Sequence, residues 1–264
     1  MELSLSVRLA FELAGDADVL LQIEAAPLPD QVVSNQWIGL SPTKSFARVA
    51  AQDSIGERIW LRADGRFDVD YIASVTVQRR AEELGALGAV PACALPAETV
   101  AYLFNSPYCP ADRFNVIAQS DFGDTSGGAR IAAIRDWVGA HVAYAPGSSD
   151  STTNAMDTYV QRGGVCRDFA HVLIALARAS GIPARYVAVY APHVAPQDFH
   201  AVAQVYLADP GGTGGAWHLV DATGMAEPAE MAIIGVGRDA ADVSFLTSFG
   251  QCQMLVQSVF VSVG

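Results

Sequence analysis

The stretch RGGVCRDFAHVLIALARASGIPARYV, residues 162–187, sets a cysteine directly after two glycines and a valine and before a long apolar segment. The segment predicts a helix from about Cys166 to Ser180, ended by Gly181 and prevented from restarting by Pro183. Apolar residues lie on most sides of this helix, a pattern typical of a helix buried between other elements. We therefore expect a buried helix whose first residue is a cysteine.

The position of Cys166 favours a reactive thiol. A helix N-terminus carries unpaired backbone N–H groups and partial positive charge, which stabilise a thiolate. The preceding glycines let the backbone pass close to a substrate, and the unpaired N–H groups can donate to an oxyanion. Cysteine is also among the residue types most often buried in protein cores. The position alone therefore leaves both a nucleophile and a core thiol open.

Two downstream segments supply a base for the thiol. FHAVAQVYLA (199–208) and AWHLVDATG (216–224) flank the Pro- and Gly-rich loop DPGGTGG (209–215), which predicts a hairpin. A hairpin centred in that loop sets His200 opposite Asp221, with both side chains on one face. A thiol nucleophile needs such a base and a group that orients it. The sequence therefore predicts that one hairpin supplies both.

The remaining histidines and a nearby acid fit structural roles better. His218 is expected to face away from the carboxylate on its strand, and His171 lies about 140° around the helix from the cysteine. Asp168 in the first helical turn favours the helix dipole. The other histidines, His141 and His193, have no obvious partner. We expect no metal and no cofactor, because no residues show the spacing of metal ligands or of a nucleotide-binding loop.

The N-terminal part of the chain has a different pattern. Residues 2 to about 79 alternate between apolar and polar positions in short segments separated by turn residues, which is typical of a β-sandwich. Between about 80 and 98 the alternation stops and Ala, Gly and Pro accumulate. We therefore predict an α+β protein with an N-terminal β-sandwich domain at 1–80, a junction at 81–97 and a catalytic domain at 98–264.

The composition argues against several classes of partner. The chain of 264 residues is 51% hydrophobic and has a net charge of −12, and Lys44 is its one lysine. Without a basic run to neutralise phosphates, we expect no nucleic acid and no membrane as a partner. No segment is apolar enough to span a membrane, and charged residues interrupt the N-terminus where a secretory signal would be apolar. The four scattered cysteines fit a reducing compartment, so we expect a cytoplasmic protein.

The segments around Cys166, His200 and Asp221 resemble the transglutaminase-like superfamily, in particular its bacterial cysteine peptidases. The resemblance lies in GGVCRDFAHVLIALARASGIPARYV, FHAVAQVYL and WHLVDATG, and extends to AYLFNSPYCPADRF, GVGRDAADVSFL and the N-terminal β segments. It implies a papain-like core, with the nucleophile at the start of a buried helix packed on an antiparallel sheet. It also implies a catalytic triad. Cys166 would be the nucleophile, His200 the general base and acid, and Asp221 the group that orients the imidazole.

The function that this resemblance implies is a thiol-dependent amide or peptide hydrolase, or an acyltransferase, acting on a protein or peptide substrate through a thioester. The sequence does not separate hydrolysis from transamidation. Val202 and Ala222 stand where many relatives carry tryptophan and proline, so the substrate cleft can differ. Of the family's oxyanion donors, only the backbone N–H of Cys166 can be assigned to a residue of this sequence. We expect Trp137 to pack between helices rather than to stabilise the oxyanion.

Two alternatives to this function stay open. The first is a catalytically idle scaffold that keeps the transglutaminase-like fold and binds protein. The second is acyl transfer like that of the arylamine N-acetyltransferases, whose cysteine motif also begins Arg-Gly-Gly. In those enzymes the cysteine lies early in the chain rather than after a β domain.

Overall fold

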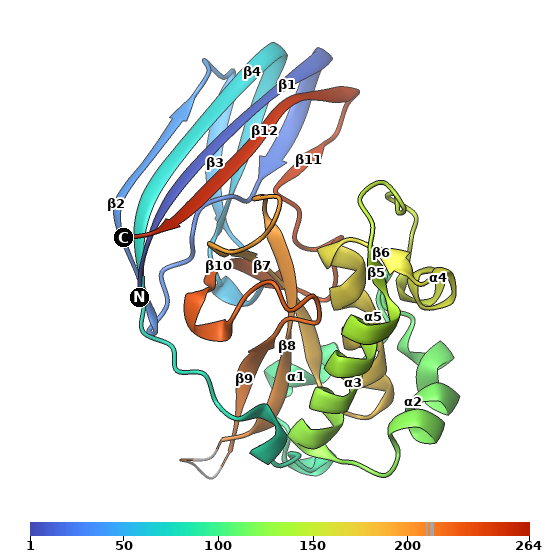
Figure 1. Ribbon diagram of the computed structural model, residues 1–264. Helices are drawn as coiled ribbons and strands as arrows, with labels where there is room; N and C mark the ends of the chain where they lie inside the picture. Colours follow the sequence, from blue (N-terminus) through green and yellow to red (C-terminus); the bar gives the residue numbers. More distant parts are fainter. Residues whose placement is uncertain (210, 212–213) are drawn as a thin grey trace.

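The computed structural model describes residues 1–209, 211 and 214–264. The chain forms a region of long β-strands at one end and a mixed region of helices and strands at the other (Figure 1). The predicted α+β fold with an N-terminal β domain is confirmed. Among the described residues, no helix is both long and apolar enough to cross a membrane.

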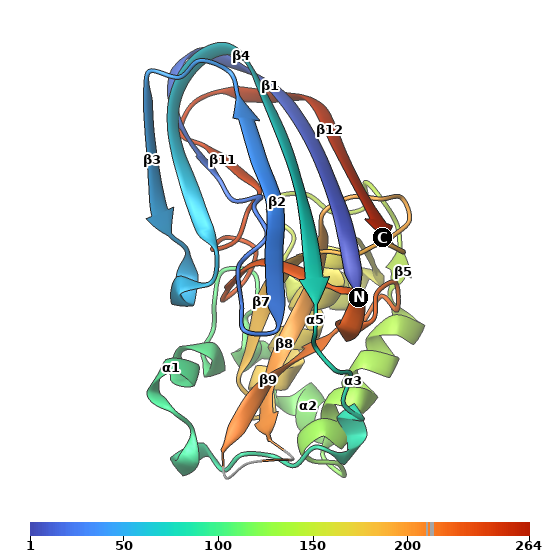
Figure 2. The ribbon, with the colours of Figure 1, turned by 90° about the vertical axis from the view of Figure 1, so that its left-hand side faces the viewer.

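The β region is built on two long strands, β1 (Glu2–Leu21) and β4 (Glu57–Val77), which pair antiparallel along almost their whole length. β2 (Gln31–Leu40) pairs with one half of β4, and β3 (Ser45–Ala50) pairs with the other half. The register of β1 and β4 shifts once, where the sheet bends over on itself (Figure 2). The bent sheet thus supplies the two layers of the β domain.

Alternating residues of these strands form the core between the layers. Odd-numbered positions from Leu3 to Leu13 are buried, with exposed residues between most of them, as the sequence pattern predicted. Near the bend, the rings of Phe11 and Phe67 stack with their centroids 5.4 Å apart. Gly65, which pairs with Leu13, has a φ of +62° that favours glycine. Segments predicted as separate strands are joined in β1 and β4, because the pairing resumes directly after the bend.

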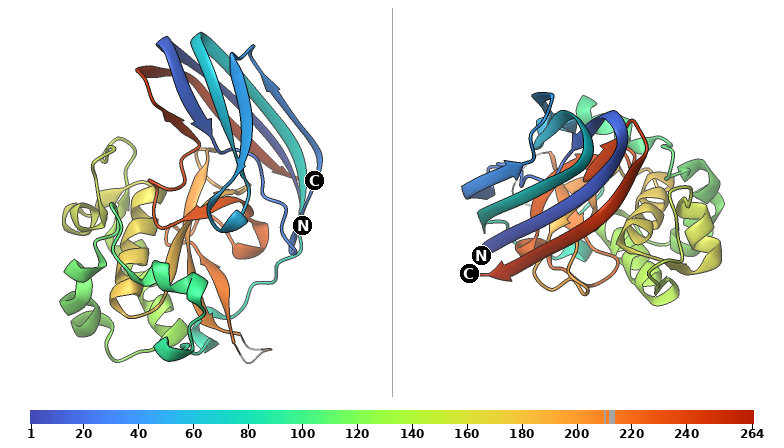
Figure 3. Two further views of the ribbon diagram at one scale, coloured as in Figure 1. Left: turned by 180° about the vertical axis from the view of Figure 1, so that it is seen from behind. Right: turned by 90° about the horizontal axis from the view of Figure 1, so that it is seen from above.

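The last two strands return to the β region. β11 (Leu246–Ser248) and β12 (Cys252–Val263) both pair antiparallel with β1, and the two chain termini lie side by side (Figure 3). The catalytic domain expected at 98–264 therefore differs from the structure at its end, since its final strands belong to the N-terminal sheet. The physical reason is that β12 satisfies the backbone groups that β1 would otherwise leave unpaired at a sheet edge. The expected junction stays a prediction.

The second sheet has four antiparallel strands in the order β10-β7-β8-β9. Their bounds are Ala184–Tyr190 for β7, His200–Ala208 for β8, Gly215–Val220 for β9 and Ala232–Gly237 for β10. Helix α5 (Cys166–Ala179) packs on this sheet, mainly against β8. It ends one residue before the predicted end, and Gly181 follows with a φ of +73° that stops the helix.

Helices α2 (Asn115–Phe122), α3 (Gly127–His141) and α4 (Ala155–Gln161) pack against α5 (Figure 1). The short helix α1 comprises Ala97–Val100. Two-residue strands β5 (Ala143–Tyr144) and β6 (Gly163–Gly164) pair in parallel. The 3-10 helices are Gln52–Ser54, Leu84–Ala86, Ala92–Ala94, Ala101–Leu103, Ala111–Phe114 and Pro228–Glu230.

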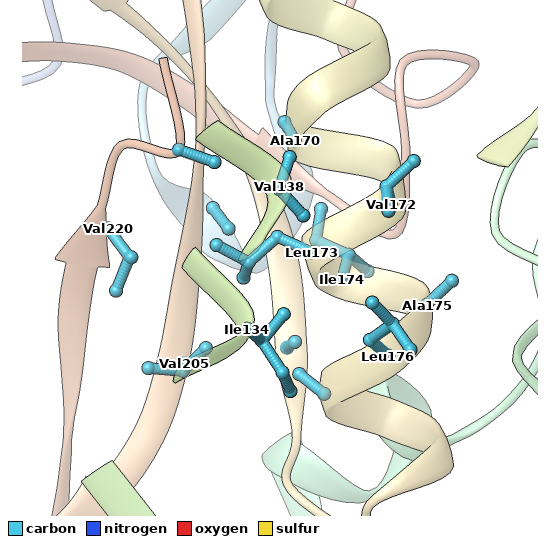
Figure 4. Packing of buried hydrophobic residues seen from close by; sticks show 14 of the residues in the cluster. Ile134, Val138, Ala170, Val172, Leu173, Ile174, Ala175, Leu176, Val205 and Val220 are labelled. Carbon is cyan, nitrogen blue, oxygen red and sulfur yellow. The ribbon is translucent and has the colours of Figure 1, made fainter. Parts of the chain in front are cut away.

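Helix α5 is the centre of the core in this region. Its consecutive residues from Val172 to Ala177 are completely buried, which requires packing on every side of the helix. Figure 4 shows Val172 to Leu176 among Ile134 and Val138 of α3 and Val205 of β8. The predicted burial of this helix on an antiparallel sheet is confirmed.

Removing apolar volume from α5 should destabilise the whole protein. Leu173→Ala is expected to lower the free energy of unfolding by about 2–5 kcal/mol, because it leaves a cavity in a closely packed core. Urea denaturation followed by circular dichroism measures this change. The control Val160→Ala truncates a side chain of α4 that is 70% exposed and should change stability by less than about 0.5 kcal/mol. Equal effects of the two substitutions would contradict the packing of α5.

Candidate active site

Cys166 is the first residue of α5, and the chain that leads to it has little freedom. The parallel pairing of β5 with β6 holds the two glycines before it, and Val165 continues in an extended conformation. A Cβ atom at Gly164 would lie 2.7 Å from the Cβ of Asp168, closer than two carbons can approach. Glycine at this position thus permits the tight entry into the helix that positions the thiol.

Asp168 has the structural role that its place in the first turn predicted. Its buried carboxylate accepts hydrogen bonds from the backbone N–H of Val165 at 2.8 Å and from the hydroxyl of Ser149. The guanidinium of Arg167 pairs with its other oxygen at 2.9 Å. A carboxylate bound to a backbone N–H at a helix N-terminus fixes the start of the helix. Asp168 therefore acts on the position of Cys166.

His200 and Asp221 meet through a buried hydrogen bond. His200 is the first residue of β8, and Asp221 follows the last residue of β9. The Nε2 atom of His200 lies 2.9 Å from Oδ2 of Asp221, and both side chains are almost completely buried. The carboxylate also accepts hydrogen bonds from the backbone N–H groups of Thr223 at 2.8 Å and Ala226 at 3.0 Å. These donors fix the carboxylate, which in turn orients the imidazole.

The hairpin that carries this pair has a different register from the predicted one. The prediction sets His200 directly opposite Asp221, whereas the structure pairs Ala203 with Val220, a shift of two residues. Asp221 therefore lies beyond the paired part of β9 and reaches the imidazole diagonally. A shift of two keeps a side chain on the same face of a sheet, so the predicted contact still forms. Positions 210, 212 and 213 of the predicted turn lie outside the described residues.

The environment of His200 favours its charged form. Burial lowers the pKa of His200, but the interactions with Asp221 and with the nearby thiol of Cys166 outweigh this effect and raise it to about 9. Burial likewise opposes ionisation of Asp221, yet the hydrogen bond and charge of His200 hold the pKa of that carboxyl below its usual range. The raised pKa of His200 and the lowered pKa of Asp221 together favour an imidazolium beside a carboxylate, with the thiol of Cys166 nearby.

A cavity of about 360 Å³ lies beside the thiol and the imidazole. Cys166 and His200 both line it. Its wall includes the aromatic rings of Tyr108, Tyr186, Phe199 and Phe245. Gln22 and Gln257 reach the same cavity from the β region. The candidate site therefore lies where the β region meets the mixed region.

The other histidines have different surroundings. Burial lowers the pKa of His171 to about 3, so its ring is neutral, and its Nε2 atom accepts a hydrogen bond from the backbone N–H of Ala240 at 3.2 Å. His218 lines a second cavity, of about 980 Å³, to which Cys166 does not contribute. Among the described residues, no group of three or more His, Cys, Asp or Glu side chains is arranged to hold a metal ion.

Trp137 packs within the helical layer, as expected. Its ring stacks on Tyr159 with centroids 5.1 Å apart and on His141 with centroids 4.6 Å apart. The guanidinium of Arg162 lies 4.4 Å from the centroid of the Trp137 ring, a cation–π contact. Arg162 has a φ of +61° and ends α4 directly before the two glycines. This contact thus helps to hold the chain that leads to the thiol.

Tyr144 is a neighbour of Cys166 that the sequence did not reveal. It lies in β5 opposite Gly164, with its ring centroid 6.0 Å from that of Phe169. Burial raises the pKa of Tyr144 to about 12, and the Cys166 thiol adds to this rise, so the phenol keeps its proton beside the sulfur. A two-residue strand leaves no periodic pattern, so only the pairing of β5 with β6 makes this contact visible.

Known proteins support the family expected from the sequence. The family model of the transglutaminase-like superfamily matches residues 117–222, a range that contains Cys166, His200 and Asp221. A solved structure from Cytophaga hutchinsonii, named a "putative cysteine protease", has 30% sequence identity and a TM-score of 0.92. That similarity covers 99% of this chain and 90% of the other.

A curated relative matches over a shorter part. An uncharacterized protein of Mycobacterium leprae (strain TN) is 35% identical over 123 residues, 43% of this chain. The matched segment spans 41% of that relative, so the two proteins correspond over less than half of its length. The similarity to the Cytophaga hutchinsonii structure extends over almost the whole chain, β region included. By its sequence and its fold, the chain belongs to the transglutaminase-like superfamily.

Proposed function

We propose that this chain is a thiol-dependent amide hydrolase or acyltransferase that acts on protein or peptide substrates. The observation that carries the proposal is the buried 2.9 Å hydrogen bond between His200 and Asp221. The imidazole of His200 lines the same cavity as the Cys166 thiol. A nucleophile, a base and an orienting carboxylate in this order are the parts that covalent acyl transfer requires. The superfamily and the Cytophaga hutchinsonii relative support the same class of reaction.

In the first half-reaction, the Cys166 thiolate attacks the carbonyl carbon of the substrate amide, and a bond forms between sulfur and carbon. The oxyanion is stabilised by the backbone N–H of Cys166 at the helix start, where the dipole adds positive charge. The imidazolium of His200 gives its proton to the leaving amine as the carbon–nitrogen bond breaks. The products are a thioester on Cys166, a free amine and a neutral imidazole.

In the second half-reaction, neutral His200 takes a proton from water or from an acceptor amine as this attacks the thioester. The carbon–sulfur bond breaks, the thiolate leaves, and the imidazolium is restored. Attack by water gives hydrolysis, and attack by an amine gives transamidation. Throughout the cycle Asp221 keeps its charge and orients the ring.

The reactivity of the thiol as a function of pH tests the proposed pairing of Cys166 with His200. A thiolate–imidazolium pair should make Cys166 react with iodoacetamide near pH 6 at least about tenfold faster than an ordinary thiol of pKa about 8.5. Because the pKa of His200 is about 9, its imidazolium persists up to that pH, and the advantage over an ordinary thiol should persist between about pH 6 and 8. Peptide-resolved mass spectrometry measures the rate at each cysteine.

Exposed Cys93 is the internal reference in the same samples. The variant His200→Gln should bring Cys166 down to the profile of Cys93, since the charge that stabilises the thiolate is gone. A Cys166 that follows Cys93 in the unaltered protein, with no effect of His200→Gln, would favour the idle scaffold instead.

The substitution Asp221→Asn should keep the shape of the site and remove the charge that supports the imidazolium. We expect the rate at which p-nitrophenyl acetate acylates Cys166 to fall roughly 10²–10⁴-fold. The release of p-nitrophenolate in stopped flow gives this rate. The control Asp136→Asn removes an exposed carboxylate on α3, and its rate should match that of the unaltered protein. An Asp221→Asn rate within about twofold of the control would remove Asp221 from the mechanism.

A further inference from the structure

The chain that leads into His200 is held by side chains rather than by a sheet or a helix. Residues 191–199 run from the end of β7 to the start of β8 without regular secondary structure. Among the described residues, no backbone-to-backbone hydrogen bond outside the strand ladders involves this segment. The pairing of β7 with β8 ends where Val189 lies opposite His200. The place of the imidazole therefore depends on the side chains that hold the preceding segment.

Gln197 holds this segment against the last strand of the β region. Its side-chain Nε2 atom donates to the backbone oxygens of Val261 at 2.8 Å and of Pro192 at 3.0 Å. Its Oε1 atom accepts a hydrogen bond from the backbone N–H of Val261 at 2.9 Å. Exchanging the amide oxygen and nitrogen would set two donors against each other at that N–H, so the orientation of the amide is fixed. One side chain thus pairs with both backbone groups of Val261, as a neighbouring strand would.

Strand β12 offers these backbone groups because it is the edge of its sheet. Of the described strands it pairs with β1 alone, so the backbone groups on its other side have no strand partner. Val261 is buried, and a buried N–H or C=O without a partner costs free energy. Gln197 satisfies both groups, so the same contact stabilises the edge of β12 and the segment before His200.

The two residues directly before His200 are held by the β region as well. Nε2 of Gln257 on β12 donates to both carboxylate oxygens of Asp198, at 2.7 and 2.9 Å. The ring of Phe199 stacks on that of Phe245, which directly precedes β11, with centroids 4.8 Å apart. Consecutive residues ahead of the imidazole thus contact the C-terminal part of the chain, which leaves the backbone of His200 little freedom.

The partners of the imidazole are positioned independently of this segment. Asp221 is fixed by the backbone N–H groups of Thr223 and Ala226, and Cys166 is fixed by its place at the start of α5. The imidazole must meet both partners at once, and a displacement of about 1 Å is enough to impair a reacting pair. The segment that ends in His200 is therefore the part whose placement decides whether the three side chains meet.

We propose that Gln197 is a positioning residue of the candidate active site, through which strand β12 sets the place of His200 between Cys166 and Asp221. Gln197 does not line the 360 Å³ cavity, so it acts through the imidazole and not on a substrate. The inference rests on the proposed function and deepens it, because it makes the last strand of the β region a part of the catalytic geometry.

The substitution Gln197→Met tests the proposal, because it keeps the length of the side chain and removes its hydrogen bonds. Long-range ¹H–¹⁵N spectra of ¹⁵N-histidine-labelled protein, recorded across pH, give the pKa of His200. We expect this pKa to fall from about 9 to roughly 8, because the imidazolium loses contact with its partners. Iodoacetamide should alkylate Cys166 roughly tenfold more slowly near pH 6, since the thiolate loses the support of that charge.

The control Gln253→Met makes the same exchange at an exposed glutamine of β12 and should leave both values unchanged. Gln197→Asn draws the amide back by one methylene, so it should show the same fall as Gln197→Met and replaces that variant if it does not fold. Circular dichroism confirms that each variant is folded. A pKa of His200 that stays at its unaltered value, even where the melting temperature falls, would give Gln197 a purely structural role and overturn the proposal.

The same spectra decide the proposal if the thiol chemistry fails. If Cys166 of the unaltered protein reacts like Cys93, the proposed function is refuted, and the tautomer of neutral His200 then reports its position. The hydrogen bond to Asp221 holds the neutral ring in the Nε2–H form. Gln197→Met should convert part of the population to the Nδ1–H form, and an unchanged tautomer would refute the positioning role.

Discussion

The burial of α5 on every side is the constraint on which the candidate site depends. Its residues from Val172 to Ala177 are completely buried, and close packing around them holds the helix in one position between the second sheet and the outer helices. Cys166 is therefore positioned by the packing of a core helix, and Asp168 fixes the last bonds that lead to it. A reactive group on a rigid element keeps its geometry better than one on a loop, which is what covalent catalysis requires.

The β region is joined to the site by direct contacts. The hydroxyl of Tyr190 in β7 donates to the backbone oxygen of Ile23, and the rings of Tyr71 and Tyr190 stack with centroids 6.5 Å apart. Residues of β7 and β10 belong to the same apolar core as the strands of the β region, β1, β4 and β12. This shared core brings Gln22 and Gln257 to the wall of the cavity. The β region is therefore a structural part of the candidate site, which gives a physical reason for its presence in the chain.

Local patterns in the sequence account for the parts of the structure that were predicted correctly. The apolar run after Cys166 predicted α5 to within one residue of its end, and the alternation before residue 80 predicted the buried face of β1. The hairpin prediction brought His200 to Asp221 although its register was off by two, because a shift of two preserves the face. These features depend on neighbours within one element or one hairpin.

Contacts between distant segments were not predictable in this way. The pairing of β12 with β1 joins the two ends of the chain. The sequence of neither strand identifies the strand with which it pairs. The places of Tyr144 beside Cys166 and of Gln22 at the cavity wall follow from such long-range packing. Alternation tells which face of a strand is buried, but the choice of neighbouring strand depends on the whole fold.

The charge of His200 is the most direct test of the proposed site, since the ring is hydrogen-bonded to Asp221 and lies near the thiol of Cys166. Long-range ¹H–¹⁵N correlation spectra of ¹⁵N-histidine-labelled protein, recorded across pH, report the charge and tautomer of this ring. We expect His200 to stay an imidazolium until a pH near its pKa of about 9, and Cys166→Ser to lower this pKa. A His200 that titrates near the ordinary value of about 6.5, unchanged by Cys166→Ser, would contradict the proposed thiolate–imidazolium pair.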